Sequence, residues 1–223
     1  MKKNLFLSVI LTACFCLGLI FLISDQVQTV SSNKILFSEN PASSSATPTI
    51  IIDAGHGGPD PGKVSESGTL EKDINLNIAL RLKELLENQD MNVIMIREED
   101  KDLATDTNKR KLSDIKERVN IMENSNADMV ISIHQNSYPD ESIKGAQVFY
   151  HTLTPEAEDI ASIIQEALRT IDPNNKRQIK ENDTYYMLKN SKVPTIIVEC
   201  GFLTNPEEAA KLTQEDYQTQ LAQ

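Results

Sequence analysis

The chain has 223 residues, 33 of them acidic and 22 basic, so its formal net charge is −11. Hydrophobic residues make up 39% and charged residues 25%, which fits one globular domain with appendages and excludes a collagen-like or largely disordered chain. The acidic excess argues against nucleic-acid binding, because that function needs clustered lysine and arginine.

The first 23 residues predict a membrane anchor or a signal segment. Two lysines precede Leu5 to Ile23, an uncharged and mostly apolar run of 19 residues, close to the length that spans a bilayer. A cleaved signal peptide is the alternative, and the residues before Cys14 also resemble a lipoprotein processing site. All three alternatives place the rest of the chain outside the cytoplasm, and two of them attach it to the membrane.

Residues 24–47 predict a flexible linker, because they include seven serines and show little hydrophobic periodicity. The folded domain is therefore expected at 48–223. In this region, apolar runs typical of buried strands occur at 49–53, 91–96, 129–133, 145–150 and 195–199. Helical spacing occurs at 74–86, 112–122 and 160–171, and Thr154-Pro155 and Asn205-Pro206 each combine an N-cap residue with a following proline. The alternation predicts a single α/β domain, a mostly parallel twisted sheet of about six strands covered by helices on both faces.

Polar side chains follow three of the predicted strands. His56 comes after the first strand, His134 ends the third, and Glu199 ends the last. The glycine-rich loop after His56 leads to Glu71 at the expected start of the first helix. Because the carboxyl ends of parallel strands meet at one edge of a sheet, these four side chains are expected to converge.

Two imidazoles and one carboxylate form a His₂Glu set, which is typical of catalytic zinc sites that keep a fourth position open. Zinc in such a site lowers the pKa of a water molecule and polarises a carbonyl group. A carboxylate at the end of a neighbouring strand, here Glu199, is then placed to act as general base and acid.

Each residue also has a purely structural interpretation. Glu71 could be a first-turn acid favoured by the helix dipole, His56 could belong to a glycine turn or an anion-binding nest, and His134 could be a core histidine. Glu199 is harder to explain in this way, because an unpaired buried carboxylate is costly. Taken together, the four residues favour a metal site with one zinc ion.

Four segments, in this order and spacing, resemble the zinc-dependent N-acetylmuramoyl-L-alanine amidases of the Amidase_3 type. The resemblance covers residues 48–215 and implies that His56, Glu71 and His134 bind zinc while Glu199 is the catalytic acid/base. The segments are IIDAGHGG at 51–58, LEKD at 70–73, ISIHQN at 131–136 and VECGFLTN at 198–205.

The resemblance also implies a substrate and a setting. The substrate is peptidoglycan, cleaved at the amide between the lactyl group of N-acetylmuramic acid and L-alanine of the stem peptide. A single N-terminal segment without wall-binding repeats is similar to the germination-specific, CwlD-type subgroup. That subgroup strips stem peptides from spore-cortex precursor glycan, the first step towards muramic-δ-lactam.

Further residues carry smaller predictions. Asn136 lies two residues after His134, so it either hydrogen-bonds substrate or forms a turn. Arg97 and Arg118 could meet a substrate carboxylate, although fold-stabilising ion pairs are the favoured interpretation. His151 is interpreted as a surface residue outside the metal site. Cys200 is interpreted as a small buried hydrophobe, with a fourth metal ligand as the alternative.

Other functions remain open at this stage. A zinc peptidase acting within the stem peptide is one alternative, and a non-catalytic, metal-dependent wall-binding or regulatory protein is another. The sequence ends soon after Tyr217, where members of the family usually continue through an amphipathic helix, so a partner could cover that part of the sheet. A further hypothesis is therefore that activity depends on an accessory activating protein.

Overall fold

The computed structural model describes residues 47–223, which form one compact unit. The predicted N-terminal segment at 1–23, and the predicted linker except residue 47, lie outside the described residues. Across 47–223, none of the helices has both the length and the apolar character needed to cross a bilayer.

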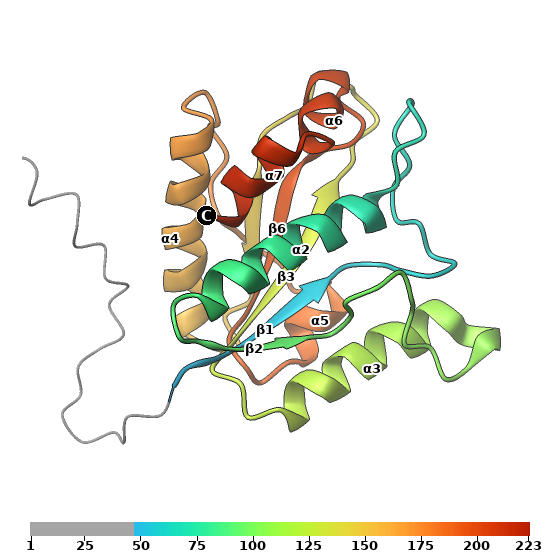
Figure 1. Cartoon of the computed structure of the whole chain (residues 1–223), viewed down its shortest axis with the longest axis vertical. Coiled ribbons are helices and arrows are strands. Elements are labelled where there is room, and N and C mark those ends of the chain that lie inside the picture. The colour runs from blue at the N-terminus through green and yellow to red at the C-terminus, as the bar shows by residue number, and fades with distance from the viewer. Residues whose placement is uncertain (1–46) are drawn as a thin grey trace, which may run out of the picture. The chain divides into compact units, whose positions relative to one another are not determined.

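A six-stranded sheet forms the centre of the domain (Figure 1). Neighbouring strands run parallel, except for β4 and β6, which are antiparallel. This confirms the predicted mostly parallel sheet. In spatial order the strands are β2 (Asn92–Met95), β1 (Thr49–Ala54), β3 (Met129–Asn136), β6 (Thr195–Phe202), β4 (Gln147–Tyr150) and β5 (Lys180–Glu181).

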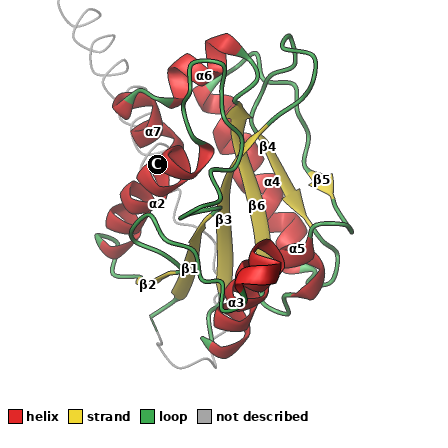
Figure 2. Ribbon diagram, turned by 90° about the vertical axis from the view of Figure 1, so that its right-hand side faces the viewer, coloured by secondary structure: helices red, strands yellow, loops and turns green. Residues whose placement is uncertain are grey.

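Helices cover both faces of the sheet, as Figure 2 shows. One face packs against α2 (Glu71–Glu87), α4 (Glu156–Ile171), α6 (Pro206–Leu212) and α7 (Glu215–Ala222). The other face packs against α3 (Arg110–Asn124), which follows a short 3-10 helix at Thr107–Lys109, and against α5 (Tyr186–Asn190). The C-terminal residues thus form a helix that packs against α2.

The apolar run of β1 is buried because it faces helices on both sides. Ile52 and Ala54 belong to the core under α2 and α4, whereas Ile51 packs in the core under α3. Side chains alternate between the two faces of a strand, so a strand covered on both faces needs apolar residues at consecutive positions.

Two predicted helix starts have different outcomes. The Asn205 side chain accepts a hydrogen bond from the Glu208 backbone N–H at 3.0 Å, which confirms the predicted cap of α6. The predicted cap at Thr154 is wrong: α4 begins one residue later, with Pro155 in the cap position and no side-chain cap. The Thr154 carbonyl oxygen instead accepts the Ala157 backbone N–H at 3.1 Å, so the backbone closes the first turn.

The parallel arrangement of β1, β3 and β6 brings their carboxyl ends to one rim of the sheet. His134 on β3 pairs in register with Glu199 on β6. His56 follows β1 by two residues, and Glu71 is the first residue of α2. The strand ends therefore carry the predicted polar residues to the same place.

Candidate metal centre

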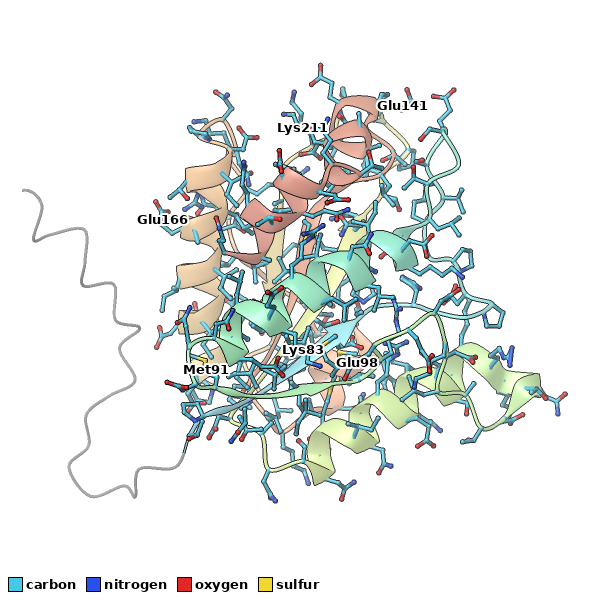
Figure 3. The ribbon with its side chains drawn as sticks, viewed as in Figure 1. Lys83, Met91, Glu98, Glu141, Glu166 and Lys211 are labelled. Atoms are coloured by element: carbon cyan, nitrogen blue, oxygen red, sulfur yellow. The ribbon has the colours of Figure 1, made fainter. Side chains whose placement is uncertain are left out.

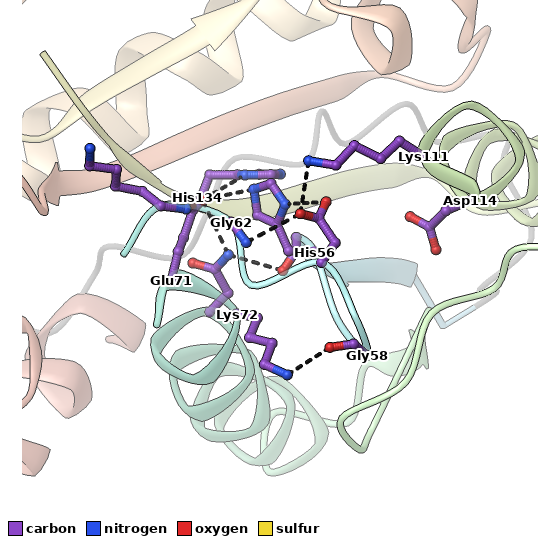
Figure 4. Close-up of polar contacts among 12 residues, drawn as sticks. His56, Gly58, Gly62, Glu71, Lys72, Lys111, Asp114 and His134 are labelled. Atoms are coloured by element: carbon purple, nitrogen blue, oxygen red, sulfur yellow. Dashed lines mark hydrogen bonds and ion pairs between the residues drawn. The ribbon is translucent and has the colours of Figure 1, made fainter. Parts of the chain in front are cut away.

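His56, Glu71 and His134 lie together at this rim (Figure 4), and one potential ligand atom from each lies within 4.8 Å of the others. Glu71 Oε1 is 3.2 Å from His56 Nε2 and 3.0 Å from His134 Nδ1. The two imidazole rings stand edge to face, with centroids 5.0 Å apart. Among the described residues, this is the group of His, Cys, Asp and Glu side chains whose geometry suits a metal ion.

The loop after β1 orients His56. Its backbone has a φ of +63°, a left-handed conformation that few non-glycine residues adopt. Asp60 fixes the ring, because Asp60 Oδ2 lies 2.9 Å from His56 Nδ1. A proton on Nδ1, directed at this carboxylate, leaves Nε2 as the ring nitrogen that can bind a metal ion, and Nε2 lies 3.2 Å from Glu71 Oε1.

Glycine at position 55 gives the second imidazole its place. A Cβ atom at Gly55 would lie 2.3 Å from the His134 ring, so a larger residue would force the ring to move. The Gly55 carbonyl oxygen also accepts the Asn75 side-chain amide at 3.0 Å, which ties the loop to α2. The glycine therefore permits a close approach of backbone and ligand.

Glu71 is buried, and both of its carboxylate oxygens accept hydrogen bonds. Its Oε2 accepts the Lys63 backbone N–H at 2.7 Å, and its Oε1 accepts the Gln135 backbone N–H at 3.0 Å. Burial alone would raise the pKa of Glu71, but His134 and His56 outweigh burial and hold it far below its ordinary range. Glu71 in turn outweighs the effect of burial on His134 and raises the pKa of that imidazole to about 9. The Glu71 carboxylate therefore stays ionised and stabilises positive charge at this rim.

Two buried arginines hold the backbone of the loop that follows β1 by hydrogen bonds to its carbonyl oxygens. Arg118 pairs with Asp53 at 2.5 Å and with Asp114 at 2.6 Å, and it donates to the His56 carbonyl oxygen at 2.7 Å. Arg97 donates to the carbonyl oxygens of Ala54, Gly55, Lys72 and Glu99. Both arginines are 1% exposed, so neither can meet a substrate carboxylate. The predicted ion pairs are confirmed for Arg118, whereas Arg97 stabilises the fold through backbone carbonyl groups instead.

Glu199 faces the cluster from the neighbouring strand. It is 7% exposed, and its Oε2 has no hydrogen-bond partner in the described structure. Burial raises the pKa of this carboxyl to about 7, because the opposing effect of His134 is smaller and Glu71 adds repulsion. A buried carboxylate with a free oxygen is costly unless a proton, an ion or a ligand satisfies it.

An open cavity of about 320 Å³ joins Glu199 to the cluster. Asn136 lines it, so this side chain lies beside the candidate metal ligands. Tyr185 also lines it, and sequence reasoning missed this residue because it lies in a loop before the short helix α5. Its remaining walls are His56, Glu71, His134, Gln135, Ser137 and Ile197.

Two other candidate residues stay outside the metal centre. The imidazole Nδ1 of His151 accepts the Leu153 backbone N–H at 2.8 Å, so this side chain closes a turn after β4. Cys200 is 3% exposed within the apolar core, and burial raises the pKa of its thiol to about 12. A thiol this hard to ionise is a poor metal ligand, which supports the interpretation of Cys200 as a buried hydrophobe.

The described residues suit a divalent metal with an open coordination position. Two imidazoles and a carboxylate supply three ligands, and the cavity beside them leaves access for a substrate. Glu199, whose Oε2 has no hydrogen-bond partner among the described residues, lines the same cavity. This arrangement fits metal-assisted hydrolysis, with Glu199 as the proton carrier.

Comparisons with known proteins agree with this geometry. The sequence profile of the Amidase_3 family, described as N-acetylmuramoyl-L-alanine amidase, matches residues 50–223. The germination-specific N-acetylmuramoyl-L-alanine amidase of Bacillus subtilis is 41% identical over 177 residues, which cover 78% of this chain and 74% of that protein.

Solved structures show the same similarity. The CwlD amidase from Clostridioides difficile, in complex with the GerS lipoprotein, has 41% sequence identity and a TM-score of 0.76, covering 79% of this chain and 93% of that one. An N-acetylmuramoyl-L-alanine amidase from Clostridium difficile 630 has 34% identity and a TM-score of 0.71, covering 80% and 92%. The fold described above is therefore shared with amidases of known structure.

Proposed function

The chain belongs to the Amidase_3 family and is an N-acetylmuramoyl-L-alanine amidase, and on this basis we propose that it is a zinc enzyme of spore-cortex maturation. The bond cleaved is the amide between the lactyl group of N-acetylmuramic acid and L-alanine of the stem peptide. The observation that carries the zinc proposal is the buried, unpartnered carboxylate of Glu199 beside the His56–Glu71–His134 cluster.

In this proposal His56, Glu71 and His134 hold one zinc ion. The fit rests on the donor set, because two imidazoles and a carboxylate are characteristic ligands of catalytic zinc. When bound, zinc supplies Lewis-acid activation of the scissile carbonyl and of the attacking water. Asp60 and the Lys63 and Gln135 backbone amides orient the ligands by the hydrogen bonds described above.

Glu199 moves the proton. Its carboxylate takes a proton from the attacking water while the water oxygen bonds to the lactyl carbonyl carbon. The same proton then passes to the nitrogen of L-alanine as the carbon–nitrogen bond breaks, so a free amine leaves. Burial raises the pKa of this carboxyl above its ordinary range, which makes it a better proton acceptor than an exposed glutamate.

The walls of the cavity position the substrate. Asn136 provides an amide that can hydrogen-bond the substrate, and Tyr185 stands in the same cavity as Glu199. Burial and the nearby Glu199 raise the pKa of the Tyr185 phenol, so its hydroxyl stays protonated as a donor. In this proposal Asn136 and Tyr185 bind the scissile amide, and Glu199 transfers the proton.

The biological setting follows from similarity. A relative that is 41% identical is the germination-specific amidase of Bacillus subtilis, and this supports a role in stripping stem peptides from cortex precursor glycan, the step before muramic-δ-lactam forms. The enzyme then works outside the cytoplasm, with residues 1–23 as its membrane anchor or signal segment. In a sporulating cell this is the space between the two membranes around the forespore.

An accessory activating protein is also part of the proposal. The CwlD amidase from Clostridioides difficile was solved in complex with the GerS lipoprotein, which supports a partner of this kind for the present chain. A partner would act on turnover or on zinc retention, so its addition should change one of these two quantities in the purified enzyme.

Product mass spectrometry tests the reaction. Zinc-loaded enzyme and its Glu199→Gln variant are incubated with muropeptides, and the masses of the released fragments are measured. Stem peptides with a free N-terminal L-alanine, from the unmodified enzyme only, would support the proposal. Fragments cut within the stem would indicate a peptidase, and intact muropeptides with zinc still bound would indicate a binding role or a missing partner.

A spore assay tests the setting. Spores of a strain that lacks this gene are expected to have cortex without muramic-δ-lactam, measured by chromatography and mass spectrometry of digested cortex. Expression of the intact gene should restore the lactam, and the Glu199→Gln form should not. Normal lactam content in the deletion strain would contradict the cortex role while leaving the amidase assignment in place.

A further inference from the structure

A second cavity, of about 440 Å³, is lined by four basic side chains, although the whole chain carries a net charge of −11. The loops before β4 and β5 and the last turn of α6 form its walls. Lys211 stands on α6, as Figure 3 shows. The other three are Lys144, Lys176 and Arg177, and Asp172 is its one acidic wall residue.

Arg177 is held in a fixed orientation. Its guanidinium lies over the Phe202 ring, 5.0 Å from the centroid, and its Nε donates to the Lys144 carbonyl oxygen at 3.1 Å. Its backbone N–H donates to the Asn175 side chain at 3.0 Å. Within residues 47–223, the two terminal guanidinium nitrogens have no hydrogen-bond partner, so a pre-oriented pair of donors stays available to an anion.

The backbone around this arginine is closely packed. Gly145 has a φ of +103°, and a Cβ atom there would lie 2.7 Å from Asn175 Oδ1 and 3.1 Å from Arg177 Cγ. Asn175 is buried, and its side-chain amide donates to the Ala146 carbonyl oxygen at 2.8 Å. The two loops therefore hold each other in place, and the cavity is formed before any ligand arrives.

The remaining charges leave the cavity cationic. Lys144 pairs with Glu207 at 3.1 Å, so its charge is compensated. Asp172 accepts the Asn174 backbone N–H at 3.0 Å within its own turn. Lys176 and Lys211 are exposed and have no ion-pair partner within residues 47–223. Two uncompensated ammonium groups thus join the free face of Arg177.

The cavity lies on the same rim of the sheet as the metal centre. The segment between β3 and β4 connects them, because Ser137 lines the metal cavity while Ser142, Lys144 and Gly145 line the basic one. Phe202, under Arg177, is the last residue of β6, the strand that carries Glu199. A long polymer that lies across this rim can therefore contact both places.

We infer that this basic cavity, Lys176–Arg177–Lys211, binds a carboxylate of the peptidoglycan polymer at a distance from the scissile amide. The inference rests on the proposed function for its substrate. Stem peptides repeat along a glycan strand and carry carboxylates, so a strand with one stem at the metal centre offers others nearby. A local cationic site lets an acidic enzyme retain an anionic polymer, which its overall charge would repel.

The test compares a double variant, Lys176→Glu/Lys211→Glu, with the control Lys116→Glu/Lys189→Glu. The control makes the same change in charge at exposed lysines on α3 and α5, which line neither cavity. All forms also carry Glu199→Gln, so that the polymer stays intact. Sedimentation with insoluble peptidoglycan measures affinity at low and high salt, and the active forms are assayed separately on a short muropeptide with a single stem.

The expected result is about a tenfold loss of polymer affinity at low salt in the cavity variant only. Its turnover of the short muropeptide should match that of unmodified enzyme. Arg177→Lys, which keeps the charge but loses the paired donors, should also weaken polymer binding.

Unchanged sedimentation of the cavity variant, or an equal loss in the control, would overturn the inference. If unmodified enzyme fails to cleave the short muropeptide, that result indicates a binding role or a missing activating partner, while the sedimentation comparison still decides whether this cavity binds the polymer.

Discussion

Asp60 orients a candidate metal ligand without belonging to the metal cluster itself. Its Oδ2 lies 2.9 Å from His56 Nδ1, and its Oδ1 lies 3.0 Å from Lys111 Nζ. Partners of this kind hold the tautomer and the angle of a ligand imidazole, and their loss typically weakens metal binding by about 10- to 100-fold. Asp60→Ala should therefore lower zinc affinity by that factor, measured by competition with a chromophoric chelator.

Lys111→Met is the matched control for Asp60→Ala. The Lys111 side chain is 79% exposed and pairs with Asp60 Oδ1, not with the Oδ2 atom that faces His56. Its removal should therefore leave zinc affinity within about twofold, as expected for an exposed ion pair. Equal affinity of Asp60→Ala and unmodified protein would show that the loop backbone alone orients His56.

The buried Asp53–Arg118 pair makes stability depend on pH. Burial alone would raise the pKa of Asp53, but Arg118, His134 and the Ser132 hydroxyl together outweigh burial and lower that pKa below its unfolded value of about 3.9. A carboxyl with a lowered folded-state pKa contributes its full stability above the unfolded value and loses it as the pH falls through the folded value. Asp53→Asn should cost about 3–5 kcal/mol at pH 7, because Arg118 is left buried without that partner.

Urea denaturation at pH 7 and at pH 3 checks the Asp53 prediction. The difference in unfolding free energy between the variant and the unmodified protein should shrink at the lower pH, because below about pH 3.9 Asp53 takes up a proton in the unfolded chain while the native pair resists protonation. A difference that is the same at both pH values would show that lost hydrogen bonds, such as that from the Ser132 hydroxyl at 2.6 Å, account for the effect instead.

At the scale of elements, the loop between β1 and α2 depends on glycine for two separable reasons. Gly62 and Gly68 both have positive φ values, +66° and +87°. A Cβ atom at Gly62 would lie 2.6 Å from Glu71 Oε2 and 2.7 Å from His56 Cδ2, whereas none of the neighbouring atoms lies within 4 Å of one at Gly68. Gly62 therefore leaves space for the side chains of two candidate ligands. Gly68 only allows the backbone to adopt a positive φ without steric strain.

Alanine at each position separates the two effects. Gly68→Ala should cost about 1 kcal/mol of stability through backbone strain and leave zinc affinity unchanged. Gly62→Ala should cost at least as much stability and also weaken zinc binding, because the new methyl group displaces Glu71 and His56. Thermal unfolding of the metal-free proteins and chelator competition measure the two quantities. Equal zinc affinity in both variants would contradict the assigned role of Gly62.

Some elements could be predicted from sequence and others could not, for physical reasons. The central strands were predictable because β1, β3 and β6 are covered on both faces and need continuous apolar runs. The antiparallel direction of β4 was not, because an apolar run has the same pattern in either direction. The two residues of β5 and the five of α5 are too short to show a period.

The same distinction applies to the site. Residues at strand ends could be located because chain direction alone brings them to one rim, and this holds for His134 and Glu199. Tyr185 reaches the metal cavity from a loop whose path depends on tertiary packing, so no local signal places it there. The basic cavity likewise combines two loops that are more than 25 residues apart in sequence, one with Lys144 and the other with Arg177. The sequence of either loop alone does not predict the cavity.

At the scale of the whole molecule, the metal centre sits at the edge of a core that does not depend on it. The apolar clusters on the two faces of the sheet join its strands to the helices without involving the candidate ligand side chains. Chelation should therefore abolish activity while the domain stays folded, in contrast to small zinc domains that unfold without metal.

Zinc should nevertheless raise the stability of the folded domain by mass action. At a free zinc concentration of about 1,000 times Kd, binding to the folded state alone adds about 4 kcal/mol, which appears as a higher Tm. Glu71→Gln should abolish most of this shift, because it removes the shared carboxylate, whereas Glu199→Gln should retain it. Calorimetry with zinc and with a chelator measures both, and a zinc-dependent shift that survives Glu71→Gln would place the metal at different ligands.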